Sequence, residues 1–543
     1  MKQDISGLEV RWNDEQALHW KRTGRWSGLT VADRARAIAL ATPERVTHIE
    51  GKVRLTAGEA WAQAGRLAAA LWSRGYRTGD VLAFETPNWH EAVPIDLAAC
   101  MLGLVLCPIV PIYRDRDVQL ILSDCRAKGI FVAREFRGFD YAQMMARLKP
   151  SLPQLEHVWT VRGGPGAADD LATLVAGAPD LPALPPVSPD AVKLMLYTSG
   201  TTGRPKAVLH SHNTLARGTM KGTEHWGVRP GDTTLMPSPV THVTGFCNGI
   251  ELPFLMGTRC VLMDRWNAAE AADIIEREQV SFTLCATPFL QELLDVAERE
   301  KRRLPSLRTF PCGGAAVPPE IIHRVSRVFE HCRAFRVYGS SEAPLITLGY
   351  LKDGQEKLAA ETDGEVIDYE VRIVDTAGTP LPAGAQGEIC ARGPALFLGY
   401  GNPADTAAAF DSEGFFHTGD LGYLSAEGAL VFTGRIKDLI NRGGEKISAK
   451  EVEDLLHTHP GVLQASVVAM PHPRLGETVC AYLIVQPGIS VTLDDIRGTL
   501  DAAGVAKQKY PERVIIVDEF PKTASGKVKK DLLREDVRRR LQS

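Results

Sequence analysis

The stretch from Tyr197 to Lys206 reads YTSGTTGRPK and places hydroxyls, glycines and a lysine next to one another. It follows the apolar run AVKLML, which predicts a strand. A strand that ends in Ser, Thr and Gly can turn several backbone amides toward one point, and such a nest suits a phosphate group. The spacing does not match a GxxxxGK[ST] loop, because Gly200 and Gly203 are three apart and no hydroxyl residue follows Lys206. A polar surface loop is the alternative interpretation.

Four later segments carry side chains that could contact the base, the sugar and the metal ion of a nucleotide. YGSSE ends in Glu342, HTGDLGYL contains Asp420, FTGRIKD contains Arg435 and PKTASGK ends in Lys527. An aromatic ring, small hydroxyls and a carboxylate at a strand end can stack on a base, contact a phosphate and hold a divalent cation. Each residue alone has a plainer interpretation: a core aromatic, a turn aspartate or a solvated lysine.

The motifs taken in order resemble the adenylate-forming superfamily, which comprises acyl-CoA synthetases, peptide-synthetase adenylation domains and beetle luciferases. The eight segments are YTSGTTGRPKAV, PSPVTHVTGF, PCGGAAVPPE, RVYGSSEAP, GEICARGPALFLGY, FHTGDLGYL, FTGRIKDLINRGGEKIS and PKTASGK. They extend from residue 197 to residue 527. The stretch FRGFDYAQM, with IVPIYRDRDV before it, resembles a narrower branch that contains cyclohexanecarboxylate–CoA ligase and related enzymes.

The resemblance implies an AMP-forming acid–thiol ligase with two half-reactions. A carboxylate attacks the α-phosphate of ATP and gives acyl-AMP and pyrophosphate, and a thiol, here coenzyme A, then displaces AMP. ATP, Mg²⁺ and CoA are therefore the expected cofactor and cosubstrates. Because both reactants of the first step are anions, catalysis should consist mainly of charge neutralisation and in-line positioning.

The resemblance assigns the ATP contacts residue by residue. Glu342 and Thr198 would hold Mg²⁺, since hard cations prefer oxygen ligands. Ser341 stands where the family usually has Thr, but it keeps the hydroxyl. Tyr338 would stack on adenine, Asp420 and Arg435 would bind the ribose, and Lys527 would be the catalyst of acyl-AMP formation. The remaining nucleotide contacts are expected from Ser199, Gly200, Thr201, Thr202, Gly203, Lys206, Gly314, Ala315, Ala316, Gly339 and Ser340.

The acyl and thiol sites follow from the same resemblance. His242 would lie beside the acyl carboxylate and swing to open the route for the thiol, with Phe246, Cys247 and Gly313 in the acyl pocket. A plainer interpretation of His242 is a satisfied histidine at a helix start. Lys437 occupies the family's hinge position, about which the C-terminal domain would rotate after adenylation. The RGGEK loop, with Gly443, Gly444 and Glu445, would then replace Lys527.

Several functions remain open at this point. A free-standing acyl-CoA synthetase for an alicyclic, medium-chain fatty or aromatic acid is the leading hypothesis. An adenylation enzyme that loads a carrier protein is the alternative, although only sixteen residues follow Lys527. A luciferase-like oxygenase and a non-catalytic nucleotide-binding regulator are further options.

The elements that must position these residues alternate between strand and helix patterns. Residues 56–76 predict a helix capped by Thr56, followed by the strand VLAFETPN, the helix WHEAVPIDLAACMLG and the strand LVLCPIVP. Residues 364–433 predict short strands with turns. This pattern predicts an α/β fold, with a large N-terminal domain (1–434) made of β/α subdomains and a small β-rich subdomain, and a small mobile α+β C-terminal domain (435–543).

Composition limits the partners. The 543 residues carry a net charge of −4, which gives no electrostatic case for nucleic acid or an anionic membrane. Ten scattered cysteines without metal spacing predict reduced thiols and a cytoplasmic enzyme, and a homodimer is one option for its assembly. The basic C-terminal run is interpreted as a helix with Leu532, Leu533, Val537 and Leu541 inward, and no integral membrane association is expected.

Overall fold

The computed structural model describes residues 1–164, 169–198, 205–314, 317–523 and 527–542. A seven-stranded sheet in the order β10-β7-β5-β6-β11-β12-β20 forms the centre of the N-terminal region. The neighbours from β10 to β11 are parallel, whereas β12 and β20 join antiparallel. Its strands are β5 (Val81–Glu85), β6 (Val105–Pro108), β7 (Gly129–Ala133), β10 (His157–Val161), β11 (Val192–Thr198), β12 (Lys206–Ser211) and β20 (Gly399–Tyr400).

The helices beside this sheet form where the sequence predicts them. Helix α3 (Ala57–Ser73) begins after Thr56, whose side chain accepts from the Glu59 amide while Glu59 caps the Thr56 amide in return. This reciprocal capping box satisfies two amides that an α-helix leaves unpaired. Helix α4 (Ala92–Leu102) is buried along its whole length, and the cysteine-containing run from α4 into β6 is core. Within the described ranges, no helix is long and apolar enough to cross a membrane.

A second sheet has the order β13-β14-β3-β4 and continues through single bridges to the parallel pair of β15 and β16. The sequence pattern of SFTLCATP (residues 281–288) also predicts a strand, but the segment makes only isolated bridges at Phe282 and Cys285, so that prediction is wrong. Its backbone lies between β13 and β15 and bridges to both at Phe282 and to β15 again at Cys285, so it forms no regular ladder with either strand. The elements of this layer are β3 (Val46–Glu50), β4 (Val53–Thr56), β13 (Thr233–Met236), β14 (Arg259–Leu262), β15 (Thr309–Gly313), β16 (Arg333–Val337), α11 (Ala268–Glu278) and α12 (Thr287–Glu300).

The predicted β-rich subdomain is a five-stranded antiparallel sheet in the order β17-β22-β21-β19-β18. It also holds a short helix, α15 (Pro403–Ala409), that the sequence patterns did not predict. The strands are β17 (Gly364–Glu365), β18 (Glu370–Val374), β19 (Gly387–Arg392), β21 (Phe416–Leu424) and β22 (Ala429–Arg435).

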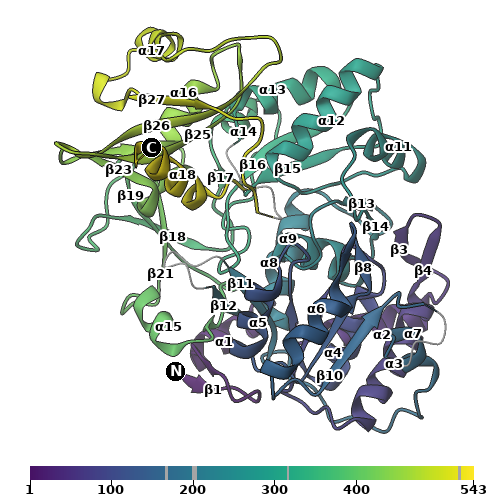
Figure 1. The fold of residues 1–543 in the computed structure, drawn as a ribbon. Coiled ribbons are helices and arrows are strands. Elements are labelled where there is room, and N and C mark those ends of the chain that lie inside the picture. The colour runs from purple at the N-terminus through teal and green to yellow at the C-terminus, as the bar shows by residue number, and fades with distance from the viewer. Residues whose placement is uncertain (165–168, 199–204, 315–316, 524–526, 543) are drawn as a thin grey trace.

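The C-terminal region builds its own apolar core around a sheet of β24, β23, β26, β25 and β27. It forms the upper left part of the molecule in Figure 1. In the last helix, α18 (Lys530–Gln542), Leu533 and Val537 are buried, but Leu532 and Leu541 are each 45% exposed. The prediction that all four point inward is therefore wrong: Leu532 is turned about 100° from the face of Leu533 and Val537 that packs on β25, and Leu541 lies in the last turn of the helix. The other elements are β23 (Leu439–Arg442), β24 (Glu445–Ser448), α16 (Ala449–Leu456), β25 (Val462–His472), β26 (Gly476–Val485), α17 (Leu493–Ala502) and β27 (Arg513–Ile516).

Candidate active site

Lys527 reaches from the C-terminal region into the site built by the N-terminal region. A Cβ atom placed on Gly314 would lie 3.7 Å from Lys527 Cε. Burial and, to a smaller extent, the cation of Arg435 lower the pKa of Lys527 to about 8, while the carboxylates of Asp420 and Glu342 oppose this shift. The turn that carries the lysine is closed by hydrogen bonds between Thr523 and Lys527. The ammonium is therefore held where two predicted nucleotide ligands lie.

Asp420 is the centre of a hydrogen-bonded group on the β-rich sheet. It is 7% exposed and accepts from the Tyr338 hydroxyl at 2.8 Å, while Arg435 Nε lies 3.3 Å from its other oxygen. Strands β21 and β22 pair Asp420 directly with Arg435. Burial raises the pKa of Asp420, and Arg435 and Tyr338 oppose that rise. The pair presents one carboxylate and one guanidinium from adjacent strands, a combination that suits neighbouring sugar hydroxyls.

Tyr338 contacts residues that the sequence did not connect to it. Its ring is 8% exposed and stacks on Phe432, with centroids 5.7 Å apart. The core-aromatic interpretation of this tyrosine therefore holds, and its adenine-stacking role stays a prediction. Gly313 is the last residue of β15 and pairs with Val337 of β16, where an added Cβ would come within 2.4 Å of the Val337 carbonyl oxygen, so only glycine fits there. Ala315 and Ala316 lie outside the described residues.

Glu342 is half-buried and accepts a hydrogen bond from the Tyr400 hydroxyl at 3.0 Å. Its neighbour Ser341 is fixed through its backbone, because His210 Nε2 donates to the Ser341 carbonyl at 2.7 Å. Burial lowers the pKa of His210 to about 4, so this ring is a neutral donor near pH 7. Gly339 and Ser340 precede them in the same half-buried loop after β16. Nothing in the sequence pattern singled out Tyr400 or His210 as supports of Glu342.

The predicted phosphate loop starts and ends on paired strands. Thr198, the last residue of β11, pairs with Lys206, the first residue of β12. Lys206 Nζ lies 3.0 Å from Asp405 of α15 and 4.9 Å from the centre of the Tyr400 ring. Lys206 therefore lies beside Tyr400, the residue that supports Glu342. Its remaining predicted members, Ser199, Gly200, Thr201, Thr202 and Gly203, lie outside the described residues.

His242 is half-buried at the start of a helical turn, and its Nδ1 atom is buried without a hydrogen-bond partner among the described residues. Burial lowers the pKa of His242 to about 4, with a smaller contribution from the Lys527 cation. The satisfied-histidine interpretation is therefore wrong for Nδ1. A neutral ring with a free nitrogen near Lys527 can contact a substrate group.

Phe246 and Cys247, predicted for the acyl pocket, open a π-helical turn, η2 (Phe246–Glu251), and both are buried. At its end Glu251 forms an ion pair with Lys193 of β11, and Lys193 Nζ lies 3.1 Å from Asp96 of α4. All three side chains are at most 2% exposed. Sequence reasoning missed this charged group, although a lysine inside the apolar run AVKLML and an aspartate inside α4 are the signals that could have found it.

The predicted hinge and thiol-side residues lie on the surface of the C-terminal region. Lys437 is exposed, and Gly443 and Gly444 form the two-residue turn between β23 and β24. Both glycines have positive φ, 61° and 98°, as the tightest hairpin turns require. Glu445 follows and is exposed. The structure thus brings Lys527 to Asp420 and Glu342, while this turn faces solvent and contacts Leu475.

Comparison with known proteins identifies the family. The model of the family described as AMP-binding enzyme matches residues 35–401, and that of the AMP-binding enzyme C-terminal domain matches residues 451–527. The chain is 34% identical over 540 residues to the medium-chain fatty-acid–CoA ligase of Escherichia coli (strain K12), covering 98% of this chain and 95% of that protein. It is 32% identical over 542 residues to the salicylyl-CoA synthase / salicylate adenylyltransferase of Streptomyces sp., covering 97% of each.

Solved structures show the same fold. ATP-bound MatB from Rhodopseudomonas palustris superimposes with a TM-score of 0.84 at 27% identity, covering 94% of this chain and 99% of that one. The resemblance that the eight motifs indicated, and the α/β architecture with a large N-terminal and a small C-terminal domain, are confirmed. The chain belongs to the AMP-binding enzyme family of adenylate-forming enzymes.

Proposed function

We propose that this protein is an AMP-forming acyl-CoA synthetase that activates a carboxylic acid with ATP and transfers the acyl group to coenzyme A. The observation that carries the proposal is the position of Lys527 beside Glu342, Asp420 and Gly314. A cation from one domain then faces the nucleotide ligands of the other. Such an arrangement can offset the negative charge that develops between the carboxylate and the α-phosphate.

Mg²⁺ would be held by Glu342, with the Thr198 hydroxyl nearby, and would supply charge neutralisation at the phosphates. The fit rests on the donor set, because Glu342 is half-buried, offers carboxylate oxygens and has one of them oriented by Tyr400. Hard oxygen ligands of this kind are what Mg²⁺ prefers. Lys206 would contact the β- and γ-phosphates, and Asp420 with Arg435 would fix the ribose.

For the second half-reaction we propose a rotation about Lys437. Residues 435–543 would turn so that Lys527 leaves and the Gly443–Gly444 turn enters, with Glu445 beside it. The support is that this turn is exposed and pre-shaped, and that the C-terminal region has its own core. Domain closure of this kind is a common gating step. His242 would move aside to open the thiol route.

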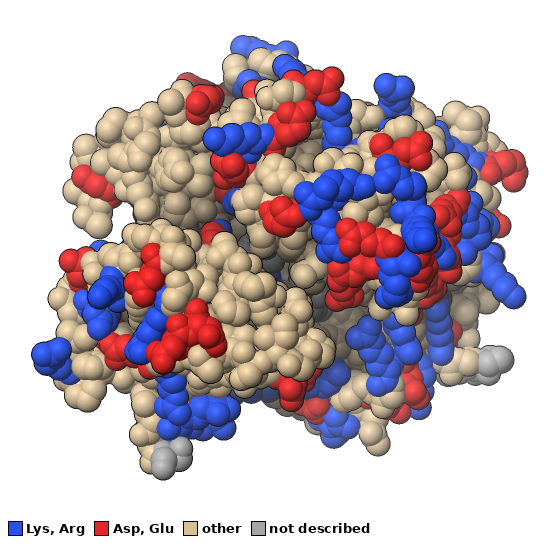
Figure 2. Space-filling model, turned by 90° about the horizontal axis from the view of Figure 1, so that it is seen from above, with Lys and Arg blue, Asp and Glu red and all other residues tan. Residues whose placement is uncertain are grey.

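We propose that the substrate is a medium-chain fatty, alicyclic or aromatic acid. We also propose that the enzyme acts in the cytoplasm. The relatives named above act on medium-chain fatty acids and on salicylate. All ten cysteines are free and buried, which suits a reducing compartment. Charged side chains of both signs are intermingled over the face drawn in Figure 2.

The test is an assay of the purified enzyme with ATP, Mg²⁺ and a panel of such acids, with and without CoA. We expect pyrophosphate release that depends on the acid, and acyl-CoA plus AMP when CoA is present. Formation of ADP and phosphate would contradict the mechanism. Adenylation without acyl transfer to CoA, but with transfer to a phosphopantetheinyl carrier protein, would support the carrier-loading alternative.

A further inference from the structure

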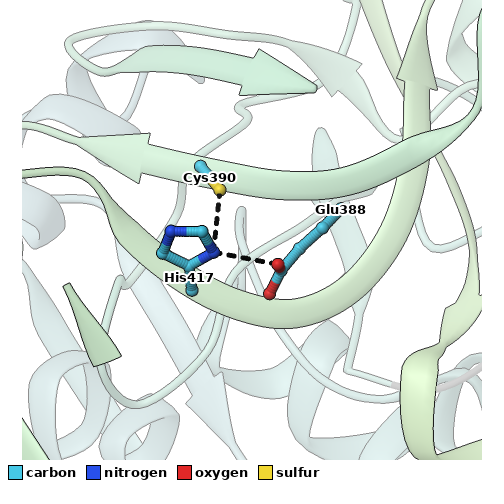
Figure 3. A group of neighbouring side chains, drawn as sticks. All are labelled: Glu388, Cys390 and His417. Carbon is cyan, nitrogen blue, oxygen red and sulfur yellow. Dashed lines mark hydrogen bonds and ion pairs between the residues drawn. The ribbon is translucent and has the colours of Figure 1, made fainter. Parts of the chain in front are cut away.

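A cysteine, a histidine and a glutamate converge on one point beside the nucleotide site. Cys390 Sγ lies 3.4 Å from His417 Nδ1, and that same nitrogen lies 2.9 Å from Glu388 Oε2 (Figure 3). The three donor atoms all lie within 4.8 Å of one another. The proposed reaction uses none of these three side chains.

The β-sheet explains why these residues meet. Glu388 and Cys390 are two apart on β19 and therefore project from the same face, and Cys390 pairs directly with His417 of β21. The register shifts between Glu388 and Cys390, so that extra residues of β21 bulge out of the ladder there. The bulge brings Glu388 close to the histidine. It also contains Asp420, and Glu388 Oε1 accepts from the Gly419 amide at 3.1 Å.

Hydrogen bonding alone does not satisfy this group. A neutral imidazole nitrogen carries either one proton or one lone pair. If Nδ1 donates its proton to the Glu388 carboxylate, Cys390 Sγ faces a nitrogen that has no lone pair to receive the thiol hydrogen. If Nδ1 instead accepts from the thiol, its lone pair faces the carboxylate. In neither tautomer can Nδ1 accept the thiol hydrogen and donate to the carboxylate at the same time, whereas one cation at the centre of the three atoms would engage all of them.

The spacing and chemistry of the donors select the kind of cation. Zinc bonds of about 2.3 Å to sulfur and about 2.0 Å to nitrogen place tetrahedral ligands about 3.5 Å apart, which the 3.4 Å between Sγ and Nδ1 matches. The 2.9 Å between Nδ1 and Oε2 needs to open by a few tenths of an ångström. Thiolate and imidazole ligands favour Zn²⁺ and similar transition metals over Mg²⁺.

A second cluster of possible metal ligands differs from this one because an arginine already lies beside it. Glu50, His90 and Glu91 also bring three donors together. There Arg162 donates to both carboxylates and lies over the Trp89 ring, so a guanidinium already supplies the positive charge. Two arginines lie near Cys390, and both stack on the Phe415 ring. Arg372 forms an ion pair with Glu413, and Arg392 forms one with Glu370, so both guanidinium groups are already paired with other carboxylates.

We propose that Glu388, Cys390 and His417 form a binding site for a thiophilic divalent cation of the zinc class, distinct from the proposed Mg²⁺ site at Glu342. On binding, the Cys390 S–H bond breaks, a metal–sulfur bond forms and the proton passes to solvent. The side chains of His417 and Glu388 are 31% and 20% exposed, so the ion enters from that side and water completes its coordination. The ion would also affect the position of Asp420, because Glu388 accepts a hydrogen bond from Gly419 in the same bulge.

The test is a titration of the untagged, metal-free full chain with Co²⁺, followed by its absorption spectrum. We expect a sulfur-to-cobalt charge-transfer band that saturates at one equivalent, disappears when Zn²⁺ is added and persists with Mg²⁺. A Co²⁺ ion at Glu342 has no sulfur ligand and gives no such band, so failure of the proposed enzymatic function would leave this readout unchanged.

Matched variants locate the site. Cys390→Ser and His417→Ala should each abolish the band, whereas Cys480→Ser, which removes another buried thiol, and His90→Ala should retain it. Circular dichroism checks that each variant is folded. If Cys390→Ser fails to fold, the His417→Ala comparison decides. Absence of a band in the wild-type protein, or a band that persists in a folded Cys390→Ser or His417→Ala variant, overturns the proposal.

Discussion

Lys527 must carry its charge in a site that disfavours charge. Burial and Arg435 lower its pKa to about 8, against the pull of Asp420 and Glu342. The ammonium is therefore protonated below about pH 8 and loses its proton as the pH rises through that value. Because the proposed role needs the cation, kcat/KM for acyl-AMP formation should fall above about pH 8.

The Lys527→Arg variant provides the matched control for this pH dependence. A guanidinium keeps its proton to far higher pH, so its profile, scaled to its own maximum, should lose the decline near pH 8. Pyrophosphate release measured from neutral to alkaline pH gives both profiles. Identical declines in the two proteins would assign the titration to another group.

Asp420 offers a second prediction at the scale of single residues. Replacing it with Asn keeps the shape but removes the charge that faces Tyr338 and Arg435. Hydrogen bonds to a charged group contribute about 1.5–3 kcal/mol, so the Kd for ATP should rise roughly tenfold to a hundredfold. Asp375→Asn, in an exposed turn after β18, should leave the Kd unchanged. Equal affinities for all three proteins would remove Asp420 from the nucleotide site.

At the scale of elements, the charged group of Lys193, Asp96 and Glu251 joins β11, α4 and η2 behind the predicted acyl pocket. Burial works against the Lys193 ammonium, but the carboxylates outweigh it and hold the pKa of Lys193 well above its ordinary value. Burial also raises the pKa of Glu251. The positive charge of Lys193 thus offsets the energetic cost of burying these carboxylates in the core.

Lys193→Met should therefore lower the free energy of unfolding by about 3–5 kcal/mol, since it leaves buried carboxylates without their cation. Lys450→Ala removes the lysine of a helical pair whose aspartate is 44% exposed, and should cost at most about 1 kcal/mol. Denaturant unfolding of both variants and the wild type gives these values. Loss of under about 1 kcal/mol in Lys193→Met would show that the three groups are not coupled.

The elements also show what sequence alone can predict. Helix α3 follows from local signals, because Thr56 and Glu59 are three residues apart and cap each other. The contact of Tyr338 with Asp420 spans 82 residues, and no local pattern records it. The same holds for Tyr400 beside Glu342 and for His210 beneath Ser341. Motif order therefore predicted a set of candidate site residues, whereas the contacts that support them depend on long-range packing that spacing does not encode.

At the scale of the whole molecule, the proposed reaction requires two arrangements of the same two domains. In this structure Lys527 faces the nucleotide residues, and the Gly443–Gly444 turn faces solvent. A proline fixes φ at its position. If Lys437 is the hinge, Lys437→Pro should leave acyl-AMP formation near wild type and slow thioester formation on the order of a hundredfold, as misplacement of a reacting group does. Equal loss in both steps would place the hinge elsewhere.

The proposed mechanism assigns Lys527 to the first half-reaction alone, and separate assays of the two steps test that assignment. Pyrophosphate release measures acyl-AMP formation, and acyl-CoA made from supplied acyl-AMP measures thiol transfer. Lys527→Ala should slow the first step by about a hundredfold or more, as loss of one transition-state charge contact does, and should leave the second near wild type. Equal damage to both steps, or none to the first, would contradict the account.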